Sequence, residues 1–189
     1  MKGIVIKVEP NRYSVKAEEQ LIECTARGLL KLKKTPILVG DYVMIDEESK
    51  TIQKVLPRKN EFVRPPIANV DQLVIVVAST NPSPDLMLLD KQLVMAEKNG
   101  VDAIVCINKI DLDADYSSII ETYENIGYQV ITTTAKNGIG IDKLARIISN
   151  KITAFSGNSG VGKSALTNNI FNEEVAKEGA TSEKLQRGK

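Results

Sequence analysis

The sequence predicts an α/β fold in which a small β-barrel precedes a doubly wound, mostly parallel sheet. Three observations support this prediction. Short β-branched segments separated by turn residues fill residues 1–63, buried strands alternate with helices over residues 73–189, and a phosphate-loop pattern lies between the last strand and the last helix. Residues 64–72, which contain two adjacent prolines, form the expected linker between the two domains.

The composition is that of a globular protein and excludes several kinds of site. The 189 residues carry a net charge of +1, and no apolar run is long enough for a membrane span. The two cysteines, Cys24 and Cys106, each stand alone in an apolar run, which favours buried free thiols in a reducing, cytoplasmic setting. Because the sequence has no histidine, His-based acid–base catalysis and the common zinc sites are excluded from these residues.

The first domain is predicted to be a barrel of the OB-fold type. Short strands are expected over residues 3–8, 12–16, 19–25, 41–45 and 51–56. Lysines and arginines outnumber acidic residues by 12 to nine in residues 1–63, and the excess gathers in one predicted loop at Arg27, Lys31, Lys33 and Lys34. Such a patch could contact an RNA backbone, although composition alone favours an ordinary solvated loop.

The second domain alternates strands and helices. Residues 73–78 form a continuous apolar run, as is typical of a strand buried on both faces of a parallel sheet. Further strands are expected over residues 101–107, 127–132 and 151–156, and helices over residues 84–99, 116–125, 141–149 and 165–171. Sheets of this kind bind their ligands at the carboxyl ends of the strands, which is where the polar motifs of this sequence fall.

The most specific motif follows the last strand. Residues 157–164, GNSGVGKS, match the phosphate-loop pattern Gly-x-x-x-x-Gly-Lys-Ser/Thr, and a helix is expected to follow. The backbone N–H groups and the helix dipole favour phosphate, Lys163 would reach the β- and γ-phosphates, and Ser164 would offer a hydroxyl to Mg²⁺. The candidate phosphate-binding residues are Gly157, Asn158, Ser159, Gly160, Val161, Gly162, Lys163, Ser164 and Ala165. A plain Gly/Ser turn is the competing interpretation.

Two further motifs predict which base is bound. Asn108, Lys109, Ile110 and Asp111 follow one strand directly, and Thr134, Ala135 and Lys136 follow the next. Guanine presents an N1–H and a 2-amino group, which one carboxylate can accept together, and adenine presents neither at these positions. Binding adenine would therefore leave a carboxylate unpaired at a cost of about 1–3 kcal/mol. Taken alone, the first motif could equally be a turn with a capping aspartate.

The other residues of these motifs suit the remaining edges and faces of guanine. Asn108 could donate to N7 or O6 and brace the loops, and the backbone N–H of Ala135 could donate to O6. The aliphatic stems of Lys109 and Lys136 could cover the two faces of the base. Combined with the phosphate loop, these residues predict a site for GTP or GDP with Mg²⁺.

These motifs resemble those of GTPases of the translation-factor superclass, but their order along the chain is permuted. Ordinary members have the phosphate loop first, whereas here residues 108–111 and 134–136 precede residues 157–164. A circularly permuted GTPase domain behind a small barrel, joined by RPPIANVDQ at residues 64–72, resembles the bacterial ribosome small-subunit-dependent GTPase A family over essentially the whole chain.

The resemblance implies an enzyme that hydrolyses GTP to GDP and phosphate, is stimulated by the small ribosomal subunit and acts late in its maturation. It implies that the basic barrel loop contacts ribosomal RNA. We also expect a monomer without membrane contact. The family pattern continues past Lys189 with two switch segments and a C-terminal zinc-binding domain. We therefore expect an incomplete GTPase domain over residues 73–189, with zinc only in the missing part and hydrolysis negligible for this chain alone. No residue here is certainly catalytic, although Lys163 would stabilise the phosphates.

Three other functions are consistent with part of the sequence. The first is a permuted GTPase of large-subunit assembly, which the N-terminal barrel disfavours. The second is a non-hydrolysing module that binds guanine nucleotide and RNA. The third is an ATP-dependent kinase, which Asp111 disfavours.

Overall fold

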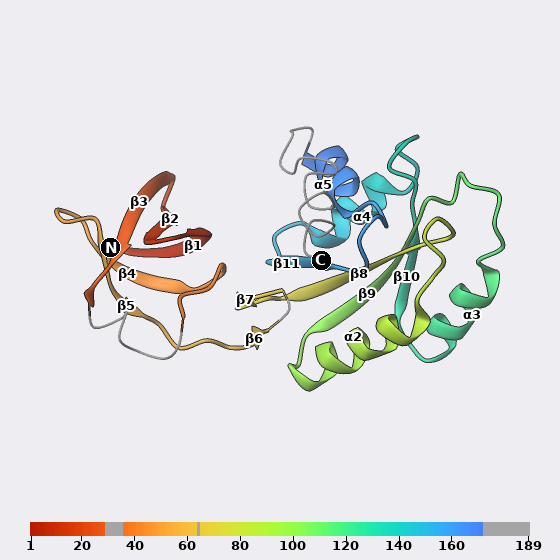
Figure 1. The fold of residues 1–189 in the computed structure, drawn as a ribbon, viewed down its shortest axis with the longest axis horizontal. Helices are drawn as coiled ribbons and strands as arrows, with labels where there is room; N and C mark the ends of the chain where they lie inside the picture. The colour runs from red at the N-terminus through yellow and green to blue at the C-terminus, as the bar shows by residue number, and fades with distance from the viewer. Residues whose placement is uncertain (29–35, 64, 172–189) are drawn as a thin grey trace, which may run out of the picture. The chain divides into compact units, whose positions relative to one another are not determined.

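The computed structural model describes residues 1–28, 36–63 and 65–171 (Figure 1). The chain divides into two compact units, Met1–Val70 and Asp71–Lys189. Three of the four candidate RNA-contacting residues, Lys31, Lys33 and Lys34, lie outside the described residues. No helix in the described part is long and apolar enough to cross a membrane.

The first unit contains the expected five-stranded closed barrel, in the order β1-β2-β3-β5-β4. Its strands are β1 (Lys2–Glu9), β2 (Arg12–Ala17), β3 (Gln20–Ala26), β4 (Tyr42–Asp46) and β5 (Thr51–Val55). Neighbouring strands are antiparallel except β3 and β5, which pair in parallel. The core is filled by the apolar side chains of Val5, Val15, Ala17, Cys24, Ala26, Ile37, Val43, Ile45 and Ile52.

Strand β1 approaches β2 so closely that one position requires glycine. A Cβ atom on Gly3 would lie 2.6 Å from Cγ1 of Val15 and 3.0 Å from the carbonyl oxygen of Lys16. Both atoms belong to the neighbouring strand, so any side chain at residue 3 would push β2 away and open the barrel core.

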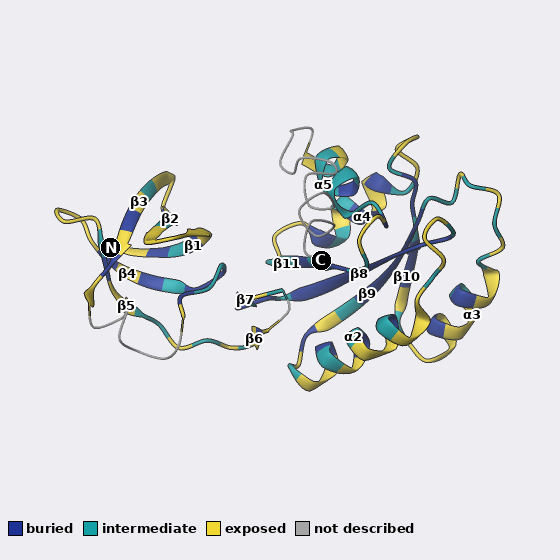
Figure 2. Ribbon diagram, viewed as in Figure 1, coloured by how far each residue is buried: buried dark blue, intermediate teal, exposed yellow. Residues whose placement is uncertain are grey.

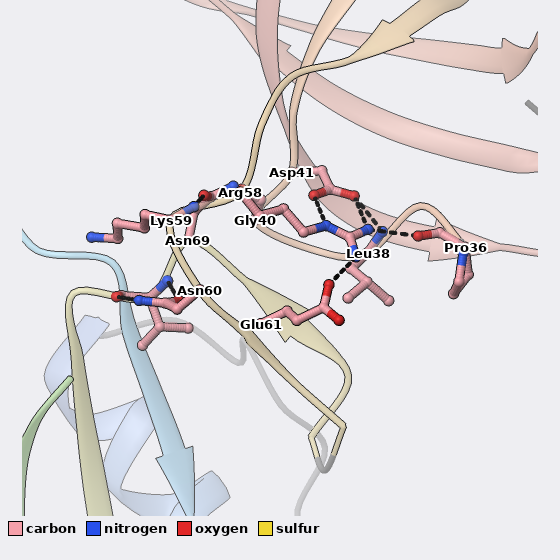
Figure 3. A network of polar contacts seen from close by, with 10 residues as sticks. Pro36, Leu38, Gly40, Asp41, Arg58, Lys59, Asn60, Glu61 and Asn69 are labelled. Carbon is pink, nitrogen blue, oxygen red and sulfur yellow. Dashed lines mark hydrogen bonds and ion pairs between the residues drawn. The ribbon is translucent and has the colours of Figure 1, made fainter. Parts of the chain in front are cut away.

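A short hairpin spans the end of the predicted barrel and the predicted linker at residues 64–72. Strands β6 (Glu61–Phe62) and β7 (Ile67–Ala68) pair antiparallel. The Asn60 side chain donates to the carbonyl of Val70 at 2.8 Å and accepts its N–H at 2.9 Å, while buried Asn69 donates to the carbonyl of Gly40 at 2.8 Å (Figure 3). The Asn60 bonds join the two ends of the hairpin, and the Asn69 bond holds it against the loop that precedes β4.

The same region contains a buried ion pair. The guanidinium of Arg58 donates to both carboxylate oxygens of Asp41, at 2.7 and 2.8 Å, and also bonds Glu61 and the carbonyl of Pro36 (Figure 3). The side chain of Asp41 is 0% exposed and that of Arg58 is 12% exposed. These partners raise the pKa of Arg58 despite its burial, with the Asp41 hydrogen bonds as the largest cause, so the guanidinium keeps its charge.

The second unit is built on a four-stranded parallel sheet in the order β10-β9-β8-β11. Its strands are β8 (Gln72–Ala78), β9 (Asp102–Asn108), β10 (Gln129–Thr132) and β11 (Thr153–Ser156). Every residue of β8 is buried, which agrees with its continuous apolar sequence and its central place in the sheet (Figure 2).

Helices cover both faces of this sheet. Helices α2 (Leu86–Lys98) and α3 (Ser117–Asn125) lie on one face, and α4 (Ile141–Ile148) and α5 (Lys163–Phe171) lie on the other (Figure 1). The strand order changes direction between β8 and β11, because the chain runs outward from β8 to β10 and then returns to the other side of β8. Ligands of doubly wound sheets bind at such a switch point, outside the carboxyl ends of the strands.

Candidate nucleotide-binding site

The phosphate-loop residues leave β11 at the switch point of the sheet and lead directly into α5. Three glycines in this loop have positive φ: 132° at Gly157, 79° at Gly160 and 97° at Gly162. A Cβ atom on Gly157 would lie 2.1 Å from the carbonyl oxygen of Val76, so the loop rests directly on the backbone of β8. Glycine is thus required here both by conformation and by space.

The ammonium group of Lys163 is held by the loop itself. It donates to the carbonyl oxygens of Gly157 at 2.9 Å and Asn158 at 2.7 Å. Partial burial lowers the pKa of Lys163 from its ordinary value of 10.5, and no carboxylate is among the causes of the shift. The charge lies at the N-terminus of α5, where the helix dipole also favours an anion. Ser164 and Ala165 follow in the first turn, both half-buried.

Asn108 links the phosphate-loop residues to the segments at residues 108–111 and 134–136. It is the last residue of β9 and is 1% exposed. Its amide donates to the carbonyl of Val161 at 2.8 Å, and its side-chain oxygen accepts from the hydroxyl of Thr133 at 3.1 Å and the N–H of Ala135 at 3.3 Å. A Cβ atom on Gly162 would lie 2.3 Å from this amide nitrogen. The three motifs therefore meet at one buried side chain.

The carboxylate of Asp111 is exposed at the edge of this arrangement. It accepts a hydrogen bond of 2.7 Å from the hydroxyl of Thr134, which is the main reason that its pKa lies below the ordinary 3.8. Lys136 and Lys109 lower this pKa further through their charge. Asp111 is consequently ionised at neutral pH, as an acceptor for two N–H groups must be.

The remaining base-motif residues have contacts that the sequence does not predict. The ammonium group of Lys109 donates to the carbonyl of Asn81, in the segment that follows β8. The N–H of Ile110 donates to the carbonyl of Thr133 at 3.3 Å, and Asn169 of α5 donates to the carbonyl of Ala135 at 2.9 Å. Lys136 is exposed.

Sequence reasoning missed three residues that support the motifs: Ser79, Thr133 and Asn169. Ser79 and Thr133 each directly follow the end of a strand. That position in the sequence is the one feature that could have indicated their role. Arg27, the one described RNA candidate, belongs to the first unit, where it is exposed and donates to Gln53 at 3.1 Å.

Among the described residues, the metal ligand that we expect beside the phosphate loop is the hydroxyl of Ser164. No group of three or more His, Cys, Asp or Glu side chains within residues 1–28, 36–63 and 65–171 could hold a metal ion. The hydroxyl of Ser164 lies in the first turn of α5, beside the loop. This single hydroxyl suits Mg²⁺, which keeps most of its waters and is held mainly by nucleotide phosphates.

Comparison with family models identifies both units. A model described as the RsgA N-terminal domain matches residues 2–52, and one described as the RsgA GTPase matches residues 55–189.

The relatives and solved structures agree with these matches. The small ribosomal subunit biogenesis GTPase RsgA of Alkaliphilus metalliredigens is 42% identical over 195 residues, covering 100% of this chain and 67% of the relative. The RsgA of Ruminiclostridium cellulolyticum is also 42% identical, covering 99% of this chain and 64% of the relative. The chain thus spans about two thirds of the length of these relatives.

Two crystal structures have the same fold. YjeQ from Thermotoga maritima is 38% identical, with a TM-score of 0.76, and the match covers 89% of this chain and 64% of YjeQ. YloQ, described as a circularly permuted GTPase, is also 38% identical, with a TM-score of 0.69, and the match covers 89% of this chain and 63% of YloQ.

Proposed function

Because the chain belongs to the RsgA GTPase family, we propose that it binds guanine nucleotides and is part of a GTPase that hydrolyses GTP to GDP and phosphate. The observation that carries this proposal is the position of Asn108, which ties the phosphate loop to the base-reading segments at the switch point of the sheet. The relatives are named as biogenesis factors of the small ribosomal subunit, and we propose that role for this protein. A role in large-subunit assembly and the binding of ATP both fit these observations less well.

Residues 157–165 would bind the phosphates. Upon binding, the ammonium of Lys163 would exchange its two loop carbonyls for β- and γ-phosphate oxygens, and the N–H groups at the start of α5 would face the same anion. Mg²⁺, held by the hydroxyl of Ser164 and the phosphates, would neutralise charge that develops on the transferred phosphoryl group.

The base would be read by Asp111 and its neighbours. The carboxylate of Asp111 would accept N1–H and the 2-amino group of guanine, and Thr134 would hold it in place through its 2.7 Å bond. Ala135 would redirect its N–H from Asn108 to O6 of the base. Its bond to Asn108 is long, at 3.3 Å, and so is readily exchanged. Asn108 would act mainly as the brace between the segments, because its amide already donates to Val161.

The proposed organisation is a barrel at residues 1–63, a connecting segment at residues 64–72 and the GTPase domain from residue 73 onward. The two compact units divide within that connecting segment, between Val70 and Asp71. We propose that the protein is a cytoplasmic monomer. Zinc belongs, in this proposal, to the part of the relatives that the chain does not span.

The barrel would supply contacts to ribosomal RNA. The proposed contacts are the basic side chains of Arg27, Lys31, Lys33 and Lys34, of which only Arg27 lies in the described part. Each lysine or arginine that neutralises a phosphate makes binding weaker as salt is raised.

Substitution of Asp111 by asparagine tests the base assignment. The carboxamide places a donor against N1–H or the 2-amino group, whereas xanthine offers a carbonyl at position 2 that the amide can meet. We expect Asp111→Asn to weaken GDP binding at least about tenfold and to strengthen binding of xanthosine diphosphate, both measured by competition with a fluorescent nucleotide. An unchanged GDP affinity, with no gain for the xanthine nucleotide, would show that Asp111 does not read the base.

A further inference from the structure

The segment directly after β8 contacts the base-reading turn at residues 108–111. The N–H of Ser79 donates to the carbonyl of Asn108 at 2.8 Å, and its hydroxyl donates to the carbonyl of Lys109 at 2.7 Å. We infer that Ser79 is a positioning residue for guanine selectivity, which holds the turn in the conformation that presents Asp111 to the base. This inference rests on the proposed function.

The backbone of the turn needs such support. Lys109 has a φ of 65°, in the left-handed region that residues with side chains rarely adopt. Ser79 is 5% exposed, so water competes little for its two bonds. Its hydroxyl therefore fixes the one residue of the turn that has an unfavourable conformation.

Other bonds hold the turn less directly. The carbonyl of Lys109 also accepts the N–H of Leu112 at 3.0 Å, and the N–H of Ile110 donates to Thr133 at 3.3 Å. The first bond lies within the turn itself, and the second is long for an N–H···O bond. Without the hydroxyl, the carbonyl of Lys109 would keep only its bond within the turn, and residues 109–111 could shift relative to Asn108, which its own bonds still hold.

The same segment also holds the side chain of Lys109. Asn81, two residues after Ser79, accepts a hydrogen bond from the ammonium group through its carbonyl. A Cβ atom on Gly160 would have Pro82 as its neighbour at 3.8 Å, so the segment reaches the phosphate loop as well. Residues 79–82 thus support both the main chain and the side chain of one base-reading residue.

Loss of the Ser79 hydroxyl should weaken recognition of one edge of the base more than it weakens overall nucleotide affinity. Asp111 follows Lys109 by two residues, and a carboxylate accepts two neighbouring N–H groups only at one angle. A small rotation of the turn would weaken the bond to the 2-amino group while the phosphate contacts persist. Ser79 therefore favours binding of one ligand class, the purine nucleoside diphosphates that have a ring N–H next to an exocyclic amine.

The test compares GDP with inosine diphosphate, which lacks the 2-amino group. The wild-type chain should bind GDP about 10- to 100-fold more tightly, the effect of one hydrogen bond to a charged acceptor. Ser79→Ala should reduce this ratio by about three- to tenfold, and Ser79→Thr, which keeps the hydroxyl, should restore it. Ser83→Ala, at an exposed serine of the same segment, is the matched control and should leave the ratio unchanged.

The outcomes separate this inference from the proposed function. Failure of the wild-type chain to bind GDP would overturn both. Wild-type selectivity with an unchanged ratio in Ser79→Ala would overturn the inference alone, even if both affinities fell together. If Ser79→Ala does not fold by circular dichroism, Ser79→Cys takes its place as a variant of similar shape with a weak donor, and the same change in ratio is expected.

Discussion

At the scale of a single residue, Asn108 shows what the sequence motif predicts and what it leaves open. The motif allows its amide either to contact guanine or to brace the surrounding loops. In the structure it donates to Val161 and accepts from Thr133 and Ala135. Periodicity and spacing place Asn108 at a strand end, but they do not specify which loop from elsewhere in the chain comes within hydrogen-bonding distance.

Lys109 has a contact that the sequence did not predict, for the same reason. The prediction that its stem covers a face of the base stands untested, and its ammonium group is bonded to the carbonyl of Asn81. Asn81 precedes Lys109 by a whole helix and strand, and its carbonyl is a main-chain group that no sequence motif marks. The position of Ser79 went unrecognised on similar grounds, since a serine at a strand end is common.

Cys106 provides a test at this scale. It is 0% exposed, and burial raises the pKa of its thiol to about 11, an effect that the hydrogen bond with Thr133 only partly offsets. At pH 8 roughly 0.1% of the thiol is ionised, so it should react with a colorimetric disulfide reagent at least 100-fold more slowly than free cysteine.

The measurement uses a Cys24→Ala variant, so that Cys106 is the only thiol. Reaction should become fast when the protein is unfolded in guanidinium chloride. Rapid labelling of the native protein would contradict the burial of β9.

At the scale of elements, hydrophobic patterns predict the main strands and helices well. Strand β8 and helix α2 were expected from a continuous apolar run and from a helical spacing that Gly100 ends, and both are found within two residues of the expected bounds. The β6–β7 hairpin was not predicted. Two-residue strands are too short to show alternation, and side-chain bonds such as those of Asn60 and Asn69 stabilise them instead.

The ion pair of Arg58 with Asp41 yields a prediction about this hairpin. Asp41→Asn would leave the largely buried guanidinium with only the exposed Glu61 as its countercharge and would weaken the bond from Leu38 N–H. We expect the barrel to lose about 3 kcal/mol of unfolding free energy, measured by chemical denaturation followed by circular dichroism.

A matched control is available in the same barrel. Glu9 pairs with Lys7 at 2.9 Å on the exposed surface, and Glu9→Gln should have no measurable effect on stability. Equal effects of the two substitutions would contradict the structural role assigned to Asp41.

At the scale of the whole molecule, the permuted order of the motifs has a simple physical explanation. The site is made of loops at the carboxyl ends of β8, β9, β10 and β11, and their positions depend on sheet order. The sequence revealed the permutation because each motif keeps its own strand and spacing wherever it occurs in the chain. Contacts between the loops could not be inferred in the same way, since they depend on the packing of β8 against β9 and β11.

The central claim is that this chain forms a guanine-nucleotide site, and titration with a fluorescent GDP analogue tests it most directly. GTP and ATP serve as competitors, and Lys163→Ala is the control that removes the ammonium group from the phosphate loop. We expect GTP to displace the analogue, ATP to fail at comparable concentrations, and Lys163→Ala to bind at least about tenfold more weakly. Preferential displacement by ATP, or the absence of binding by the folded wild-type chain, would contradict the account.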